Sequence, residues 1–419
     1  MASGEQELPT LHQRQNRSLG AEALTKIQSN EKPENIVEPV APIKEISDLV
    51  KEKGGASFQL CYQCGICDDV CPWNKVSRFS MRKLVRQATF GLTEIESEDI
   101  WRCTTCGTCP QRCTRGVDQI QLSVSLRRIA TEYGVFPDSV IPIVTVGGSL
   151  MAEGNPFNMD RAKRADWAKD LGVKTFTEGM EILYFPGCYL SYDPRMKKVA
   201  AATVKILNKA GVDFGILGAK ESCCGESIRK TGNEEAFKHL ARQNIRAFID
   251  HGVKKILVSS PHCLHTFKNE YPEFNVHFEI IHISEFLREL IKDGRLKPAR
   301  DYAKKITYHD PCYLGRHNGI FDAPRDVLKE IPGSNLTEME ESRENSFCCG
   351  GGGGRIWMDT PKEERFSDVR LRQAIDVGAE VLVTACPYCI TNFTDSSLRL
   401  ENGRTIEIKD ITEIVQEVL

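Results

Sequence analysis

The sequence predicts an α+β protein built from a mainly helical N-terminal domain and a duplicated α/β region. Eight cysteines fall in two short runs between residues 61 and 113, a density that favours small helices and loops around bound metal. From residue 181 onward, short apolar runs alternate with amphipathic segments, which is typical of α/β layers with a largely parallel sheet. The cysteine pattern of this region occurs twice, so we expect two similar α/β units related by a pseudo-twofold axis.

The bulk properties exclude several classes of protein. The 419 residues include 41% apolar and 27% charged side chains, which fits a globular protein of two or three domains. A formal net charge of −3 argues against a nucleic-acid partner, because such proteins carry a basic excess. No secretion signal is visible, and no apolar stretch reaches the roughly 20 residues of a spanning helix. We therefore expect a cytoplasmic protein without a transmembrane segment of its own, which reaches a membrane only through a partner.

Composition and motifs divide the chain into four parts. The first is a polar extension, disordered or docked on a partner, in which Pro42 to Lys53 could form an amphipathic helix. The second carries the cysteine runs and a helical linker that includes Gln121 to Tyr133. The third and fourth are the two α/β units. The expected bounds are 1–55, 56–180, 181–298 and 299–419.

The two cysteine runs have the spacing x2, x2, x3, and Pro72 follows the fourth cysteine of the first run. This pattern resembles the run of bacterial ferredoxins, in which three thiolates bind one 4Fe–4S cube and the fourth binds the neighbouring cube. Paired zinc sites, the alternative, prefer two CxxC pairs separated by a longer loop. One cluster is assigned to Cys61, Cys64, Cys67 and Cys113. The other is assigned to Cys71, Cys103, Cys106 and Cys109.

The α/β region is predicted from its alternating pattern. Its apolar runs predict strands at Ile182–Phe185, Lys255–Val258, Ile306–Tyr308 and Val381–Thr384. Its amphipathic segments predict helices at Lys198–Ala210, Glu234–Asp250, Lys362–Val377 and Ile411–Val418.

Three pairs of segments carry the internal duplication. They align without a gap and are His251–Cys263 with Val377–Cys389, Glu221–Gly225 with Ser346–Gly350, and Phe185–Leu190 with His309–Leu314. The second copy contributes five thiols, which are Cys312, Cys348, Cys349, Cys386 and Cys389. Adjacent cysteines do not easily bind one metal of a regular cube together, so the pair 348–349 favours a distorted cluster or a bridging thiolate.

This duplicated Cys…Cys-Cys-Gly…Cys-x-x-Cys pattern behind two ferredoxin-type runs resembles the catalytic subunits of heterodisulfide reductases, of the type that fuses these parts in one chain. The resemblance covers about residues 56–419. It implies that the five thiols of the second copy bind a non-cubane 4Fe–4S cluster, which cleaves a disulfide in two one-electron steps.

The first copy departs from this pattern. It keeps four thiols, which are Cys188, Cys223, Cys224 and Cys263, and it has Ser260 where the second copy has Cys386. A serine oxygen is a poor ligand for a soft iron–sulfur centre. The first copy therefore has four open outcomes: a regular cube, an altered cluster, a zinc ion or no metal.

Other motifs are weighed against simpler explanations. The run Gly350–Gly354 lacks the Gly-Lys-Ser/Thr ending of a phosphate loop, so we expect it to let the backbone pack against the centre at Cys348 and Cys349. Arg355 could contact an anion, and a structural or surface role is the favoured one. A proton donor to a leaving thiolate is one role for the histidines beside cluster cysteines, and a structural role is the favoured one. These histidines are His262, His265 and His309. A basic helical face, solvated or able to dock an acidic carrier, is formed by Arg82, Lys83 and Arg86.

The resemblance implies an oxidoreductase subunit that passes electrons from two cubane clusters to the Cys-Cys-Gly centre. Similar chains work in sulfite-reductase-linked membrane complexes and in electron-bifurcating assemblies such as the benzoyl-CoA reductase type. Expected partners are a flavoprotein, a ferredoxin-like carrier or a membrane quinone-linked subunit. Two alternatives are an electron-relay subunit of a flavin-linked dehydrogenase, of the glycolate oxidase or glycerol-3-phosphate dehydrogenase type, and a redox-sensing or assembly protein with structural clusters. No dinucleotide fingerprint or nucleophile triad is present, so flavin or NAD chemistry would belong to a partner.

Overall fold

The computed structural model describes residues 41–92, 94–399 and 405–419. Residues 42–419 belong to one compact unit. The expectation for the polar extension falls mostly on residues 1–40, which lie outside the described residues. The helix expected from Pro42 to Lys53 is present as α2 (Lys44–Val50), which continues into a π-helical turn, η2 (Lys51–Gly55).

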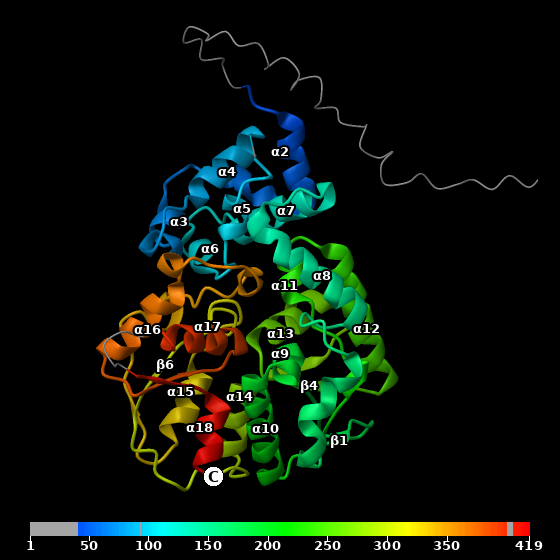
Figure 1. Ribbon diagram of the computed structural model, residues 1–419, viewed down its shortest axis with the longest axis vertical. Coiled ribbons are helices and arrows are strands. Elements are labelled where there is room, and N and C mark those ends of the chain that lie inside the picture. Colours follow the sequence, from blue (N-terminus) through cyan, green and yellow to red (C-terminus); the bar gives the residue numbers. More distant parts are fainter. Residues whose placement is uncertain (1–40, 93, 400–404) are drawn as a thin grey trace, which may run out of the picture. The chain divides into compact units, whose positions relative to one another are not determined.

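Helices form the N-terminal part of the described chain, which we call the helical region (α2 to α8; Figure 1). Its longest helix, α7 (Gln119–Tyr133), begins two residues before the predicted start, because the Asp118 side chain accepts hydrogen bonds from two backbone amides of the first turn. The other helices are α3 (Ile66–Asp69), α4 (Met81–Phe90), α5 (Asp99–Arg102), α6 (Thr108–Arg112) and α8 (Ile141–Glu153).

Within the described ranges, no single helix is both long and apolar enough to cross a membrane. One pair of helices passes the same test of length and composition when taken together. This pair is α7 with the segment Asp138–Glu153, and it bends by 98° between its members.

The first α/β unit (β1 to α14) contains a parallel sheet in the order β1-β3-β2-β4-β5. All four residues of β2 are buried, as expected for an inner strand covered by helices on both faces. The strands are β1 (Lys174–Thr175), β2 (Ile182–Phe185), β3 (Phe214–Ile216), β4 (Lys255–Val258) and β5 (Glu279–His282). The helices are α9 (Gly187–Tyr192), α10 (Pro194–Lys209), α11 (Glu226–Lys230), α12 (Glu234–Asp250), α13 (Pro261–His265) and α14 (Ile283–Lys292).

The second α/β unit (β6 to α18) contains a parallel sheet in the order β7-β6-β8-β9. This is the order of β3-β2-β4-β5 in the first unit, so the duplication seen in the sequence is present in the topology. The strands are β6 (Lys305–Tyr308), β7 (Asn335–Leu336), β8 (Val381–Thr384) and β9 (Glu407–Asp410). The helices are α15 (Asp322–Lys329), α16 (Phe366–Asp376), α17 (Pro387–Ser397) and α18 (Ile411–Glu417).

Two predicted helices have different starts in the structure. The helix predicted from Lys198 begins at Pro194, where Asp193 caps it and proline fits the first turn. The helix predicted from Lys362 begins at Phe366, because residues 362–364 form a separate 3₁₀ turn.

The two units pack through reciprocal helices. Helix α10 of the first unit packs on α18 of the second, and α14 of the first packs on α15 of the second (Figure 1). Because α10 corresponds to α15 and α14 corresponds to α18, the contacts exchange partners in the way that a twofold relation would require. The twofold axis itself stays a prediction.

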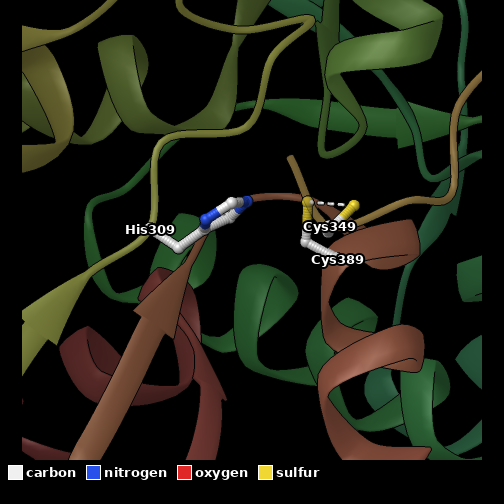
Figure 2. A group of neighbouring side chains, drawn as sticks. All are labelled: His309, Cys349 and Cys389. Carbon is white, nitrogen blue, oxygen red and sulfur yellow. Dashed lines mark hydrogen bonds between the residues drawn. The ribbon is translucent and has the colours of Figure 1, made fainter. Parts of the chain in front are cut away.

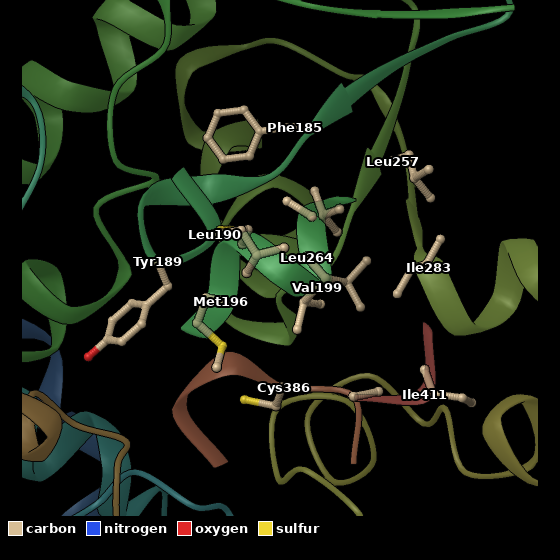
Figure 3. Close-up of a cluster of buried hydrophobic side chains, with 14 of the residues drawn as sticks. Phe185, Tyr189, Leu190, Met196, Val199, Leu257, Leu264, Ile283, Cys386 and Ile411 are labelled. Atoms are coloured by element: carbon tan, nitrogen blue, oxygen red, sulfur yellow. The ribbon is translucent and has the colours of Figure 1, made fainter. Parts of the chain in front are cut away.

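One hydrophobic core spans both α/β units. Figure 3 shows Cys386 and Ile411 of the second unit beside Met196 and Val199 of α10 in the first. A second core, inside the helical region, continues into the second unit, where it includes Tyr313. The three parts are therefore packed against one another by buried apolar side chains.

Candidate functional site

A small cavity collects one crossed set of cysteines in the helical region. Its walls include Cys71 from the first run and Cys103, Cys106 and Cys109 from the second. Burial, followed by the nearby charges of Cys103 and Cys106, raises the pKa of Cys109 well above its usual value. This grouping is the one that crossed ligation requires, since the fourth cysteine of one run lies with the first three of the other.

Backbone amides point at cysteine sulfurs in both runs. The amide of Gln63 lies 3.4 Å from the sulfur of Cys61, and the amide of Thr105 lies 3.4 Å from the sulfur of Cys103. Such N–H···S contacts stabilise thiolate over thiol, and they set the potential of iron–sulfur clusters. The donors and the cavity fit an iron–sulfur cube better than a pair of inert buried thiols.

The five cysteines of the second α/β unit converge beyond the carboxyl ends of β6 and β8. The Sγ atoms of Cys349 and Cys389 are 3.3 Å apart. Hydrogen bonds from Cys348 and Cys389 lower the pKa of Cys349 well below its usual value, despite burial. Cys312 and Cys386 touch this group through Cys348 and Cys389 respectively. All five thiols are buried, so a metal centre here would be shielded from water.

The glycine of the Cys-Cys-Gly motif is required by the backbone. Gly350 has φ +93° and Gly225, its counterpart in the first unit, has φ +89°. This left-handed region strains residues with a side chain. It turns the amide of Gly350 toward Cys348, whose sulfur lies 3.3 Å away.

A buried histidine from the first unit reaches the second-unit cysteines. His262 is hydrogen-bonded to Cys386, and although burial opposes it, the contacts with Cys389 and His262 lower the pKa of Cys386 to about 5. The other partner of His262 is Glu226, at 3.1 Å. Of the histidines flagged in the sequence, His265 lies farther along, beside Glu270.

The first unit brings its four cysteines together as a separate group. The Sγ atoms of Cys188 and Cys223 are 3.8 Å apart, and Cys224 contacts both Cys223 and Cys263. Ser260 precedes Pro261 at the start of α13, as Cys386 precedes Pro387 at the start of α17. The two positions are structurally equivalent, so this group has four thiols where the other has five.

A histidine, His309, also lies at the five-cysteine site. A ring nitrogen of His309 and the sulfurs of Cys349 and Cys389 all lie within 4.8 Å of one another (Figure 2). His309 follows β6 directly, and the edge of Phe393 packs against its ring. Burial and the charge of Arg370 lower its pKa well below the usual value, so the imidazole is neutral.

The second cysteine run packs directly on the second α/β unit. The sulfur of Cys348 lies 3.8 Å from the hydroxyl oxygen of Thr104, and the proximity of Cys348, together with burial, raises the pKa of Cys106 well above its usual value. Nearby, the hydroxyls of Thr105 and Tyr313 are 2.8 Å apart, and Arg316 donates to the carbonyl of Cys106 at 2.7 Å. Residues 104–106 of the second run therefore contact the second unit beside its five-cysteine group.

Arg127 of α7 forms hydrogen bonds to all three parts of the chain. Its fully buried guanidinium donates to four backbone carbonyls, two in the helical region and one in each α/β unit. These carbonyls belong to Ile100 (2.9 Å), Cys103 (2.7 Å), Lys230 (3.0 Å) and Gly353 (2.9 Å). Burial lowers the pKa of Arg127, and its four acceptors are all neutral carbonyl groups.

The glycine run packs on the helical region. A Cβ atom at Gly352 would lie 2.4 Å from the carbonyl oxygen of Thr104, and one at Gly353 would lie 2.4 Å from that of Cys103. The sequence predicts packing of this run against the centre beside Cys348. The structure shows that the run also allows two backbones to meet at the junction with the second cysteine run.

A cavity of about 210 Å³ opens beside the five-cysteine site. Cys349 and Gly350 lie in its wall, together with Arg355 and Arg365. Arg355 donates to the hydroxyl of Thr360 at 3.0 Å. The wall also includes the carboxylates of Asp359, Glu364 and Asp395, so charges of both signs line the cavity.

One cysteine of the first run reaches the surface. Cys64 is exposed and the other 16 cysteines are buried or half-buried. Leu60 and Tyr62 beside it are 48% and 58% exposed. The guanidinium of Arg82 lies over the backbone of Gly65, where a Cβ would be 3.5 Å away. We propose this surface as a docking face for a redox carrier, and the basic residues Lys83 and Arg86 lie on the same helix, α4.

Two arginines of the site are not predicted from the sequence. Arg370 lies four residues after Phe366 and four before Ala374, and all three are buried on one face of α16. Arg127 lies on the buried face of α7. A charged residue at a core position of a predicted helix is the signal that could have identified both.

Two family models match the chain. A 4Fe–4S dicluster domain matches residues 57–117, and a cysteine-rich domain matches twice, at residues 182–268 and 306–394. The matched segments cover the cysteines of both runs and of both α/β units.

Several relatives align over most of the chain. An EtfAB:quinone oxidoreductase of Syntrophomonas wolfei is 37% identical over 78% of this chain, and a probable iron-sulfur-binding oxidoreductase, FadF, of Bacillus subtilis is 39% identical over 77%. The chain spans about half of these two relatives, 47% of each. One polypeptide of the dihydromethanophenazine:CoB–CoM heterodisulfide reductase of Methanosarcina mazei is 32% identical over 86% of this chain and 93% of its own length. This chain, with its dicluster domain followed by two cysteine-rich domains, belongs to the heterodisulfide reductase family of iron–sulfur oxidoreductase subunits.

Proposed function

We propose that this chain carries electrons between a protein partner and a five-cysteine iron–sulfur centre in its second α/β unit. The observation that carries the proposal is the direct packing of the second cysteine run on the second unit, where the hydroxyl of Thr104 lies 3.8 Å from the sulfur of Cys348. Short separation is what serial one-electron transfer requires. A 4Fe–4S cluster supplies a one-electron redox couple when it is bound.

The proposed ligand sets follow the groups described above. The dicluster domain would bind one cluster through Cys61, Cys64, Cys67 and Cys113, and a second through Cys71, Cys103, Cys106 and Cys109. The further centre would be held by Cys312, Cys348, Cys349, Cys386 and Cys389, with adjacent cysteines that favour a non-cubane form. The amides of Gln63, Thr105 and Gly350 hold charge at three of these sulfurs.

The first α/β unit would have a supporting role in this scheme. Its thiols, Cys188, Cys223, Cys224 and Cys263, would hold at most a four-ligand centre, because Ser260 occupies the fifth position. The reciprocal packing of α10 on α18 and α14 on α15 supports a pseudo-twofold pair in which the second unit keeps the redox site.

The relatives suggest the partners. One is named for EtfAB and quinone, and another for CoB–CoM heterodisulfide. We propose that this chain works inside such an assembly and receives electrons from a flavoprotein or a ferredoxin-like carrier. It would deliver them to a quinone-linked subunit, and its position would then be cytoplasmic and peripheral to the membrane.

Iron and sulfide analysis of anaerobically purified protein tests the proposal. Each 4Fe–4S unit adds four iron atoms, so two cubes and one further centre give about 12. A content of about 8, with reduction by dithionite confined to two cubes, would reject the third centre. A zinc-containing protein without acid-labile sulfide would reject the proposal as a whole.

A second candidate function is reduction of a disulfide at the five-cysteine centre. The cavity beside Cys349 favours it, because a small disulfide that enters this cavity would meet a sulfur of the proposed ligand set. In that reaction two electrons and two protons convert one disulfide into two thiols. Full turnover of a heterodisulfide by a Cys386→Ser variant would exclude this role and leave the chain as an electron relay.

A further inference from the structure

The imidazole of His309 is buried beside the five-cysteine site with one nitrogen unused. His309 is 1% exposed, and its Nε2 atom has no hydrogen-bond partner within the described residues. Figure 2 shows the far nitrogen of the ring turned toward the sulfurs of Cys349 and Cys389. A buried ring nitrogen without a partner is costly, so its orientation toward a metal-binding group needs an explanation.

The hydrogen bond on the other side of the ring fixes which nitrogen carries the proton. The Nε atom of Arg370 lies 3.2 Å from Nδ1 of His309. An arginine has only donors, so Nδ1 must accept with its lone pair, and the proton of the neutral ring then lies on Nε2. His309 therefore presents an N–H group, and not a lone pair, to the sulfurs.

Arg370 is held firmly in this role. It is fully buried, and its two terminal nitrogens bond to Gln373 at 2.8 Å and Ser346 at 3.3 Å. The backbone of His309 is tied to β8, where it donates to the carbonyl of Val383 and accepts from the hydroxyl of Thr384. The ring cannot turn over without breaking this array.

The first α/β unit has no histidine at the position that corresponds to His309. Phe185 occupies the position that corresponds to His309, and it belongs to the unit in which Ser260 replaces the fifth cysteine. The N–H donor and the five-thiol set thus occur together in one unit and are both missing from the other.

We infer that His309 donates an N–H···S hydrogen bond from Nε2 to the iron–sulfur centre of the second unit and raises its reduction potential, with Arg370 as the residue that fixes the tautomer. The inference rests on the proposed function, because it needs a centre held by the five cysteines. Reduction adds one negative charge to that centre, and a fixed N–H dipole stabilises the more negative state more strongly. His309 is a positioning and tuning residue and not a ligand.

Three variants of the full-length, anaerobically prepared protein separate these roles. His309→Phe copies the first unit and removes the donor, while His309→Gln keeps an amide N–H. The control is His251→Phe, a histidine at the end of α12 whose ring contacts Lys220 and the carbonyl of Ala247. Iron content and an EPR-monitored redox titration are measured for each variant.

We expect H309F to keep all of its iron. At a fixed potential, its ratio of reduced to oxidised centre should fall about tenfold, which is about 59 mV for a one-electron couple. H309Q should recover most of the shift, H251F should show none, and the two cubes of the dicluster domain should be unaffected. An unchanged potential in H309F would overturn the inference, as would the loss of one cluster's iron, which would make His309 a ligand.

A protein that keeps His309 gives an independent answer should H309F fail to fold. Labelled with nitrogen-15 histidine, a His262→Gln variant, which lacks the other histidine at this centre, should still show a weak nitrogen coupling to the reduced centre in pulsed EPR. A strong coupling would indicate direct ligation by His309 and no coupling would indicate no contact, and either result overturns the inference. Absence of the third centre by iron analysis would instead overturn the proposed function.

Discussion

Replacing Arg127 by alanine tests whether one buried side chain holds the three parts of the chain together. The change removes four hydrogen bonds to carbonyls of the helical region and of both α/β units. Bonds from a charged donor contribute about 1.5–3 kcal/mol each, so the gross loss is roughly 6–12 kcal/mol. The desolvation cost of the guanidinium, several kcal/mol, disappears with it. We therefore expect a net destabilisation of roughly 3–5 kcal/mol.

The assay must be kinetic, because iron–sulfur proteins lose their metal when they unfold and do not return to the native state. The half-life of the iron–sulfur absorbance is measured anaerobically at one elevated temperature. Each 1.36 kcal/mol is a factor of ten in rate, so the half-life of R127A should fall by roughly 150- to 5,000-fold if the contacts are already broken in the transition state for unfolding.

Arg128→Ala is the matched control on the same helix. Arg128 is 17% exposed and pairs with Glu234 and with the carbonyl of Lys53. Such a partly exposed pair contributes at most about 1 kcal/mol, so its half-life should fall by less than about tenfold. If R127A and R128A decay at the same rate, the argument that Arg127 joins the domains is wrong.

Three further predictions concern the clusters, the docking face and pH. Cys71→Ser should lose the cluster bound by the second run, and Cys113→Ser should lose the cluster bound by the first run. The EPR signal that remains should therefore come from a different cube in each variant. Loss of the same cube in both variants would contradict crossed ligation. Arg82→Glu should slow anaerobic reduction of the chain by a small acidic ferredoxin about tenfold at low salt. The control Arg246→Glu, on α12 and 80% exposed, should not slow it. Equal reduction rates of the two variants in stopped flow would contradict the proposed docking face. Burial raises the pKa of Asp410 to about 7, above its ordinary 3.8, so the folded protein holds this proton more tightly than the unfolded chain. The stability of the wild type relative to Asp410→Asn should thus be greatest below pH 3.8 and be lost as the pH rises through 7; a difference in thermal inactivation that stays constant across this pH range would refute the assignment.

Much of the fold was predictable because its signals are local. The strands Ile182–Phe185, Lys255–Val258 and Val381–Thr384 and the helix Glu234–Asp250 have the predicted bounds. Each strand is an apolar run that two layers bury, and the helix begins after an asparagine cap. Short edge strands such as β7 and β1 carry little apolar pattern, so no local signal predicts them.

The grouping of the cysteines was predictable, but their surroundings were not. The spacing of the runs predicted that Cys71 lies with the first three cysteines of the second run, and the duplicated motif predicted that the thiols of each α/β unit converge. The contact between Thr104 and Cys348 depends on how two domains dock, which no local pattern encodes. The roles of Arg127 and Arg370 likewise arise from tertiary packing, where a charge on a buried helical face finds carbonyl or imidazole partners.

The glycine run at the junction with the dicluster domain also limits how this protein can be divided. With 2.4 Å between an added Cβ and the carbonyls of Cys103 and Thr104, any side chain at Gly352 or Gly353 would act as a wedge between the two modules. A linker inserted here, or a domain exchanged from a relative with a bulkier loop, would separate the second cysteine run from Cys348. The dicluster domain and the second cysteine-rich domain are therefore best treated by the protein engineer as one indivisible cassette.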